Sequence, residues 1–136
     1  MIKRISIILI VLATLLSCDN GDSLTDIFLA HPWKLSFFNE GDKRVPGNSA
    51  YVLQFYDGTF SVSTRSDATI TGNWSADTKK RTFRCSKVRV NNGTISGDTI
   101  AEKIEKILKD AQYYEGDANY LQIQVQKNRY MQFHNK

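Results

Sequence analysis

Two runs of alternating apolar and polar residues lie on either side of Asp57-Gly58, and this junction constrains the fold more than any other feature of the sequence. Asp-Gly between such runs favours a two-residue β-hairpin with a type I′ turn. A turn of this length pairs Phe55 with Phe60. Two residues further from the turn it pairs Leu53 with Val62, so all four apolar side chains share one face. The sequence therefore predicts a half-buried antiparallel sheet around this hairpin.

Alternation with a period of two also dominates most of the remaining chain. It predicts further inward-facing side chains, which are Trp33, Leu35, Phe37, Ile70, Gly72, Trp74, Phe83, Met131 and Phe133. The segment 39–49, between the first two runs, is expected to be a polar loop. Val88 and Val90 have the opposite parity to Phe83 within one run, which predicts a β-bulge near Ser86-Lys87.

The last two strands allow two loop lengths. A two-residue loop at Lys127-Asn128 would pair Ile123 with Gln132 and spoil the apolar inward face. A three-residue loop at 127–129 would instead pair Ile123 with Phe133. We therefore expect the three-residue loop, with a bulge.

Residues 99–109 change to the period of an amphipathic helix. The apolar stripe of this helix consists of Ile100, Ile104, Ile107 and Leu108. Thr99 and Glu102 fit a capping box, and Asp98 adds a favourable negative charge at the helix N-terminus. Strands precede and follow this helix without βαβ alternation. The expected class is α+β, mostly β, as a strongly curved antiparallel sheet or partly open barrel with one amphipathic helix.

The N-terminus has the pattern of a targeting segment. A basic start, Met1-Ile2-Lys3-Arg4, precedes an apolar run at 5–16. As a helix this run would span about 18 Å, which is too short for a hydrocarbon core of about 30 Å. The run ends in Leu15-Leu16-Ser17-Cys18, which resembles the lipobox of bacterial lipoproteins. This resemblance implies cleavage before Cys18 and acylation of that residue.

These features divide the chain into three parts. Residues 1–17 are expected to be a lipoprotein signal peptide, 18–30 the lipidated Cys18 with a polar tether and a short helical turn, and 31–136 a β domain. We expect the anchor to hold the protein in the cell envelope of a Gram-negative bacterium, at the outer rather than the inner membrane, periplasmic or surface-exposed. With Cys18 lipidated, Cys85 has no partner for an internal disulfide and is expected to be a small hydrophobe on a strand.

Charge and motifs exclude several functions. Without Lys3 and Arg4, 16 of the 18 basic side chains remain against 14 acidic ones, so the sequence offers no argument for a nucleic-acid partner. No nucleophile signature or phosphate-binding glycine loop is present, and the spacing of His31 and His134 does not require a metal. We therefore expect no catalytic residues, no cofactor and no metal.

Two groups of side chains are candidates for binding. The largest charge cluster is a basic run, formed by Lys79, Lys80, Arg81, Arg84, Lys87 and Arg89. It could bind anionic headgroups or an acidic partner, or it could be a solvated strand face that protects a sheet edge. Four tyrosines could line a glycan or small-molecule groove, or form the half-buried outer face of a sheet: Tyr113, Tyr114, Tyr120 and Tyr130.

The order of several motifs is similar to that of a known family. The motifs are Trp33-Lys34-Leu35, the run 51–60, Gly72-Asn73-Trp74, the helix 100–108 and a final strand at Phe133. Together they resemble the META-domain family of small bacterial envelope proteins and its lipocalin-like lipoprotein relatives. The resemblance implies a curved, partly closed antiparallel sheet with one helix, and it brings no catalytic residues. The Gly-rich Cys-Asn segment of that family is absent, and 63–67 stands in its place.

Two functions remain open from the sequence. The first is a non-catalytic envelope lipoprotein that binds an envelope protein or a wall component. The second is a lipocalin-like carrier of a small apolar ligand, which needs an empty lumen of several hundred Å³. Because the inward side chains are large, we expect them to fill the sheet interior, and we favour the binding module.

Overall fold

The structure is a computed structural model that describes residues 24–136. The expected signal peptide, Cys18 and the polar tether lie outside the described residues. Within these residues, no helix has both the length and the apolar character of a membrane span.

The described chain contains nine strands and two helical segments. The helical segments are a short π-helical turn, η1 (Thr25–Leu29), and an α-helix, α2 (Thr99–Asp110). The strands are β1 (Trp33–Glu40), β2 (Lys43–Pro46), β3 (Val52–Phe55), β4 (Thr59–Ser63), β5 (Thr69–Asp77), β6 (Thr82–Asn91), β7 (Tyr113–Gly116), β8 (Tyr120–Gln126) and β9 (Arg129–His134). The short helical turn expected before residue 30 is therefore present.

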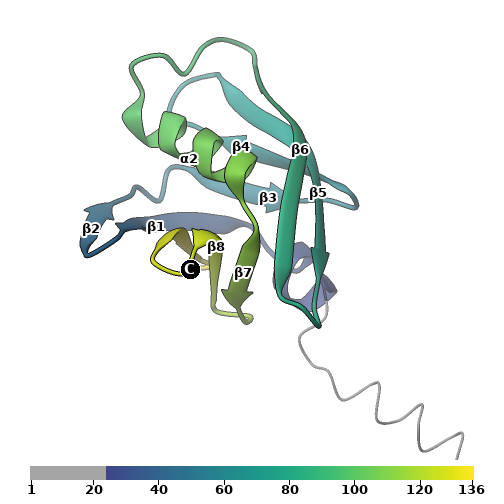
Figure 1. The fold of residues 1–136 in the computed structure, drawn as a ribbon. Helices are drawn as coiled ribbons and strands as arrows, with labels where there is room; N and C mark the ends of the chain where they lie inside the picture. Colours follow the sequence, from purple (N-terminus) through teal and green to yellow (C-terminus); the bar gives the residue numbers. More distant parts are fainter. Residues whose placement is uncertain (1–23) are drawn as a thin grey trace, which may run out of the picture.

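All strands pair antiparallel, in the order β2-β1-β3-β4-β5-β6-β7-β8-β9. β1 also pairs with β9, so the sheet curves round on itself into a ring, and β2 lies outside that ring (Figure 1). The seam between β6 and β7 is short, because Thr82 and Tyr113 form its one bridge pair. This architecture confirms the expected class, a curved antiparallel sheet that is partly open and carries one α-helix.

Helix α2 lies beside the seam, where it packs against β6, β8 and β9 (Figure 1). Its apolar stripe is buried at Ile104, Ile107 and Leu108, as expected, and half-buried at Ile100. The N-cap is Asp98, whose carboxylate accepts a hydrogen bond from the backbone N–H of Ala101 at 3.0 Å. The expected capping box at Thr99 was therefore wrong by one residue, since aspartate is a strong N-cap and takes this position.

The hairpin at Asp57-Gly58 has the expected register, with Phe55 opposite Phe60 and Leu53 opposite Val62. A type I′ turn needs a positive φ at both central residues. Gly58 has a φ of +80°, but the φ of Asp57 is not positive, so the expected type I′ turn was wrong. The bulge expected near Ser86-Lys87 is also confirmed. There the pairing of β5 with β6 shifts register and Lys87 has a φ of +53°.

Two expectations about β1 and its surroundings were wrong. The pairing of β1 with β9 shifts register between Leu35 and Phe37, so Phe38 is buried and Phe37 faces outward. The segment 39–49 is not a loop throughout, because β1 continues into a hairpin with β2, where Glu40 pairs with Lys43. β2 consists of two exposed charged residues followed by Val45 and Pro46, so it has no apolar alternation that could have marked a strand.

The last hairpin has a two-residue loop at Lys127-Asn128, so the expected three-residue loop was wrong. Gln126 pairs with Arg129, and a register shift between Gln124 and Gln126 absorbs one residue. Ile123 therefore pairs with Met131, and not with Phe133 as expected, but the bulge in the strand keeps both side chains on the inward face.

Aromatic side chains occupy the space inside the curved sheet. Phe28 of η1 is fully buried and lies 4.8–5.7 Å, between ring centroids, from four other aromatic rings: Phe55, Trp74, Phe83 and Tyr114. The indole Nε1 of Trp33 donates to the backbone carbonyl of Ile27 at 3.0 Å, which fixes η1 over this end of the sheet. The interior therefore contains a packed core here.

Candidate functional site

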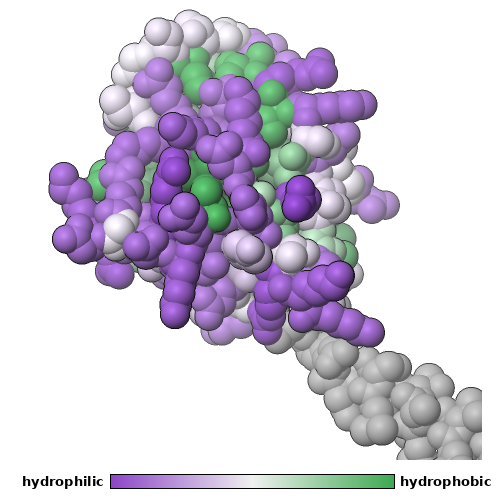
Figure 2. Space-filling model, in the orientation of Figure 1, coloured by the Kyte–Doolittle hydropathy of each residue, from purple (hydrophilic) through white to green (hydrophobic). Residues whose placement is uncertain are grey.

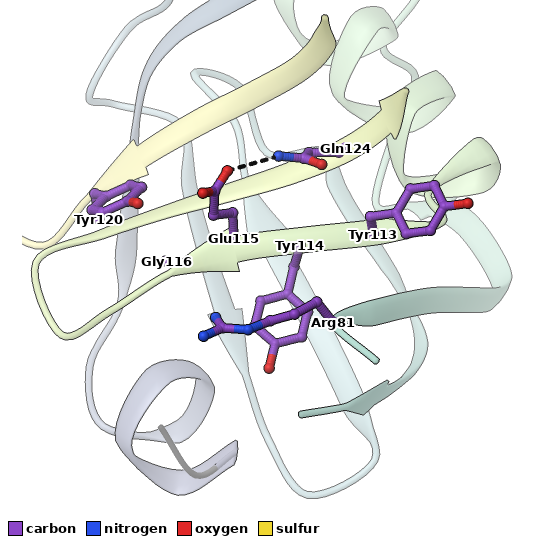
Figure 3. A pocket seen from close by; sticks show the side chains of 7 residues that line it. All are labelled: Arg81, Tyr113, Tyr114, Glu115, Gly116, Tyr120 and Gln124. Carbon is purple, nitrogen blue, oxygen red and sulfur yellow. Dashed lines mark hydrogen bonds between the residues drawn. The ribbon is translucent and has the colours of Figure 1, made fainter. Parts of the chain in front are cut away.

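An open groove of about 460 Å³ lies along β7, with lining side chains on both sides of this strand (Figure 3). We call it the tyrosine groove and define it by Arg81, Tyr113, Tyr114, Glu115, Gly116, Tyr120 and Gln124. Its position follows from the short seam, since β7 beyond Tyr113 has no bridge partner in β6. Divergence of these two strands opens the groove.

Alternation along β7 sends neighbouring side chains to opposite sides. Tyr114 points inward and is buried at 2% exposure, whereas Tyr113 is 44% exposed. Glu115 points to the outer side and faces Gln124 of β8 (Figure 3). Gly116 lies where an added Cβ would approach the carbonyl oxygen of Tyr120 to 2.5 Å, so a side chain here would displace β8.

Arg81 gives the groove its cation. It ends the turn between β5 and β6 with a φ of +57°, a left-handed conformation that costs a non-glycine residue on the order of 1–3 kcal/mol. This backbone turns the side chain along the ring of Tyr114, and the guanidinium carbon lies 5.7 Å from the ring centroid (Figure 3). The contact is a cation–π interaction.

A row of amides borders the groove on the outer face of β8 and β9. The Nε2 of Gln124 donates to the carboxylate of Glu115 at 3.3 Å and to Oε1 of Gln122 at 3.0 Å. The Nε2 of Gln122 donates in turn to Gln132 at 2.8 Å. These residues were not singled out from the sequence, although their alternation with Leu121 and Ile123 marks them as outward-facing.

The tyrosine groove has the chemistry of a binding site. Burial raises the pKa of Tyr120, and the charges of Glu115 and Asp117 raise it further, so this phenol remains a hydrogen-bond donor at neutral pH. The lining offers aromatic rings, one side-chain amide, one cation and one carboxylate. Its residues include no imidazole and no thiol that could serve as base or nucleophile. Of the four tyrosines predicted from the sequence, Tyr130 alone does not line it.

The basic run does not form a single patch, although all six of its residues are exposed. Lys79 and Lys80 lie in the β5–β6 turn, where their backbone N–H groups donate to Asp77 and lower the pKa of its carboxyl group. Arg81 belongs to the tyrosine groove. Arg84 lines a hollow of about 400 Å³ next to Lys109 and Asp110 at the end of α2.

Lys87 and Arg89 line another groove, of about 500 Å³, over β4, β5 and β6. We call it the cation groove and define it by Tyr56, Thr59, Phe60, Ser61, Thr71, Gly72, Asn73, Lys87, Arg89 and Asn91. The six basic residues thus separate because the β5–β6 turn lies at one end of the sheet and the bulge at Lys87 lies along its side.

The remaining candidate side chains have structural surroundings. Cys85 is half-buried, and burial raises the pKa of its thiol to about 12, so it is protonated and unreactive at neutral pH. His31 packs on the ring of Trp33 at 4.6 Å between centroids, and Nδ1 of His134 contacts the hydroxyl of Ser36. In residues 24–136 no group of three His, Cys, Asp or Glu side chains is placed to hold a metal.

Comparison with known proteins places the chain in a family. A family model described as a domain of unknown function (DUF4847) matches residues 45–135. A crystal structure of a DUF4847 family protein from Bacteroides vulgatus ATCC 8482 has a similar fold, with a TM-score of 0.66 and 24% identity over 84% of this chain and 98% of that one. A search of the curated proteins gave no match. Neither match names a META-domain or lipocalin-like protein. The chain belongs to the DUF4847 family, whose fold is known and whose function is unknown.

Proposed function

We propose that this protein is a non-catalytic binding module of the bacterial cell envelope, anchored by lipid at Cys18, which contacts its partner with the outside of its sheet. The observation that carries the proposal is the packed interior. Rings of Phe28, Phe55, Trp74 and Phe83 meet where a carrier would need an empty lumen of several hundred Å³. The hollows of that size described above open on the outer surface instead.

The distribution of exposed apolar side chains supports an external binding surface. In the described part of the chain, Leu29, Tyr56 and Tyr113 are the large apolar side chains that stay exposed. Tyr113 is 44% exposed in the tyrosine groove, and Tyr56 is 50% exposed in the cation groove. The face of the molecule in Figure 2 is mainly hydrophilic, with small apolar patches. An exposed aromatic ring among polar groups is typical of a recognition surface.

The proposed anchor would hold this surface close to the membrane. The five residues between Cys18 and Leu24 give six steps along the chain, which can span at most about 20 Å. Phe28 of η1 contacts Tyr114 at 5.0 Å, so the tyrosine groove lies at the same end of the sheet as η1. A partner in this groove would therefore be an envelope protein or a wall component near the anchoring membrane. We place that membrane in a Gram-negative envelope and propose the outer one.

The resemblance to META-domain and lipocalin-like lipoproteins is part of the same proposal. A curved antiparallel sheet with one helix, in the expected order, supports it. The filled interior favours the binding module over the carrier within that group.

Photo-crosslinking in intact cells tests the proposal. A photoreactive phenylalanine analogue replaces Tyr113 in the full-length chain, and a matched variant carries it at Ser49, an exposed position between β2 and β3. We expect a discrete crosslinked product from position 113 and none from position 49. Absence of a product at 113, or the same product at both positions, would contradict the proposal.

A further inference from the structure

The cation groove holds two positive charges without a counter-charge. Lys87 and Arg89 both line it, and within residues 24–136 the side chain of neither has a hydrogen-bond or ion-pair partner. None of the ten residues that line the groove is acidic. Like charges that share one groove repel each other, and an anion bound between them would remove that repulsion.

The fold directs these charges into the groove. The bulge in β6 shifts the register against β5 between Thr71, which pairs with Arg89, and Asn73, which pairs with Ser86. Lys87 occupies the extra position with a φ of +53°, an uncommon conformation for a residue other than glycine. Bulges re-aim side chains in this way next to binding sites.

The rest of the lining is rich in hydroxyl and amide groups. Register places Thr59 opposite Asn73 and Ser61 opposite Thr71 across β4 and β5. Asn91 completes the row, and its Nδ2 donates to the hydroxyl of Thr71 at 2.6 Å. Tyr56 contributes a half-exposed ring at one side. Hydroxyls and amides that both donate and accept suit a ligand with many hydroxyl groups, and an exposed ring suits the apolar face of a sugar.

We infer that the cation groove is a second binding site, separate from the tyrosine groove, and that it takes an anionic carbohydrate whose sulfate, phosphate or carboxylate groups lie between Lys87 and Arg89. This inference goes beyond the proposed function and does not depend on the partner of the tyrosine groove. A polypeptide partner would need apolar anchors, and the groove presents only Tyr56 and the edge of the buried Phe60.

The position of the groove argues against a lipid headgroup as the ligand. Thr71 lies six residues along β5 from Asp77, where the strand enters the turn at the η1 end, a distance of about 20 Å in an extended strand. The cation groove thus begins at Tyr56 and Asn73, next to the Phe55 and Trp74 rings that pack on Phe28 of η1, and extends along the side of the sheet to Thr71 and its partner Arg89. The proposed anchor would place the η1 end against the membrane, so the Arg89 end of the groove would point away from it.

Affinity electrophoresis of the full-length chain, purified in a non-ionic detergent, tests the inference. The gels contain dextran sulfate, neutral dextran or polyphosphate. We expect dextran sulfate to retard the protein, and neutral dextran to leave its mobility unchanged. Polyphosphate, which has the charge but no sugar, should bind at least tenfold more weakly. Equal retardation by polyphosphate would overturn the carbohydrate assignment, and no retardation by dextran sulfate would overturn the site.

Matched variants separate the groove from net charge. Replacing Lys87 and Arg89 with Gln should weaken binding to dextran sulfate at least tenfold. Replacing Lys79 and Lys80 with Gln removes the same charge from the exposed turn and should change binding less than twofold. Equal loss in both pairs would mean nonspecific attraction and would overturn the inference. Lys87→Arg keeps the charge and should bind dextran sulfate as the parent protein does. Its melting temperature, compared with that of the parent protein, checks that the variant is folded.

Hydroxyl variants test the sugar contacts. Ser61→Ala lies in the groove, and Ser63→Ala lies on the same strand outside it. We expect Ser61→Ala to weaken binding to dextran sulfate about threefold to tenfold and Ser63→Ala to leave it unchanged. If the two variants bound dextran sulfate equally well, the Ser61 hydroxyl would not contact the ligand, which would overturn the assignment to a carbohydrate.

Discussion

The phenol of Tyr51 donates to the two carboxylate oxygens of Asp98 at 2.9 and 2.8 Å, across 47 residues of sequence. Asp98 is also the N-cap of α2, so one hydrogen-bonded pair connects the start of β3 to the start of the helix. The helix is therefore positioned by a polar contact at its first turn as well as by its apolar stripe.

Removing this phenol should weaken the fold. We expect Tyr51→Phe to lower the free energy of unfolding by about 1–2 kcal/mol, because the half-buried carboxylate of Asp98 loses a hydrogen bond. Tyr56→Phe is the matched control: Tyr56 is half-exposed, and its hydroxyl change should cost less than about 0.5 kcal/mol. Urea unfolding of both variants measures the difference. An equal cost in the two would mean that the Tyr51–Asp98 bond contributes no stability.

The same pair predicts a loss of stability at alkaline pH. Burial and the hydrogen bond to Asp98 raise the pKa of Tyr51 to about 12, above its value of about 10 in an unfolded chain. The folded protein thus keeps a proton that the unfolded chain releases, so stability should fall as pH rises from about 10 to 12. Cys85, whose pKa burial raises to about 12, should add to this loss from about pH 9.

Urea midpoints measured between pH 8 and 12 test this prediction. The midpoint of Tyr51→Phe should fall less steeply above pH 10 than that of the parent protein, and Cys85→Ala should flatten the curve from pH 9. If both variants follow the parent curve, neither group is responsible for the alkaline loss.

The helix stripe should be structural. We expect Ile104→Asp to destabilise the protein by several kcal/mol, because it buries an unpaired charge at a fully buried position. Glu102→Asp, on the exposed side of α2, should cost less than about 0.5 kcal/mol. Urea melts compare the two. A small loss for Ile104→Asp would instead indicate that the stripe faces a partner or solvent.

Lipid anchoring depends on Cys18 in our account. We expect Cys18→Ala to abolish acylation and release the protein from the membrane fraction. Cys85→Ala removes the other thiol and should leave the protein membrane-bound. Cell fractionation with metabolic lipid labelling distinguishes them, and a Cys18→Ala protein that stays in the membrane with unchanged labelling would contradict the anchor.

Features set by short-range pattern were predictable from the sequence. The Asp57-Gly58 hairpin and the bulge near Lys87 follow from the parity of neighbouring residues, and the helix follows from its stripe. The burial of Phe38 in place of Phe37 was not predictable. It results from a bulge in β1 that depends on pairing with β9, almost a hundred residues away. β2 was not predicted, because this short and largely exposed strand shows no alternation of apolar and polar residues.

The sequence identified several residues of the candidate sites, but it did not show which of them lie together in one groove. Tyrosines and basic residues were both identified as candidates from the sequence. Their assignment to separate grooves required the strand register, which brings Arg81 to Tyr114 and Lys87 and Arg89 to the hydroxyl groups of β4 and β5. Asn73 and Asn91 gave no sequence signal beyond their outward parity.

Unfolding of Gly72→Val tests most directly whether this protein works with a packed interior and an external surface. A Cβ at Gly72 would lie 2.8 Å from the ring of Phe60 and 3.0 Å from the carbonyl oxygen of Ser86. We therefore predict that Gly72→Val loses roughly 1–3 kcal/mol of stability through overpacking. Thr69→Val, on the outer side of the same strand, should change stability by less than about 0.5 kcal/mol. A Gly72→Val protein as stable as its parent would mean that Phe60 is not tightly packed at this strand, and would contradict the packed interior on which the choice of the binding module over the carrier depends.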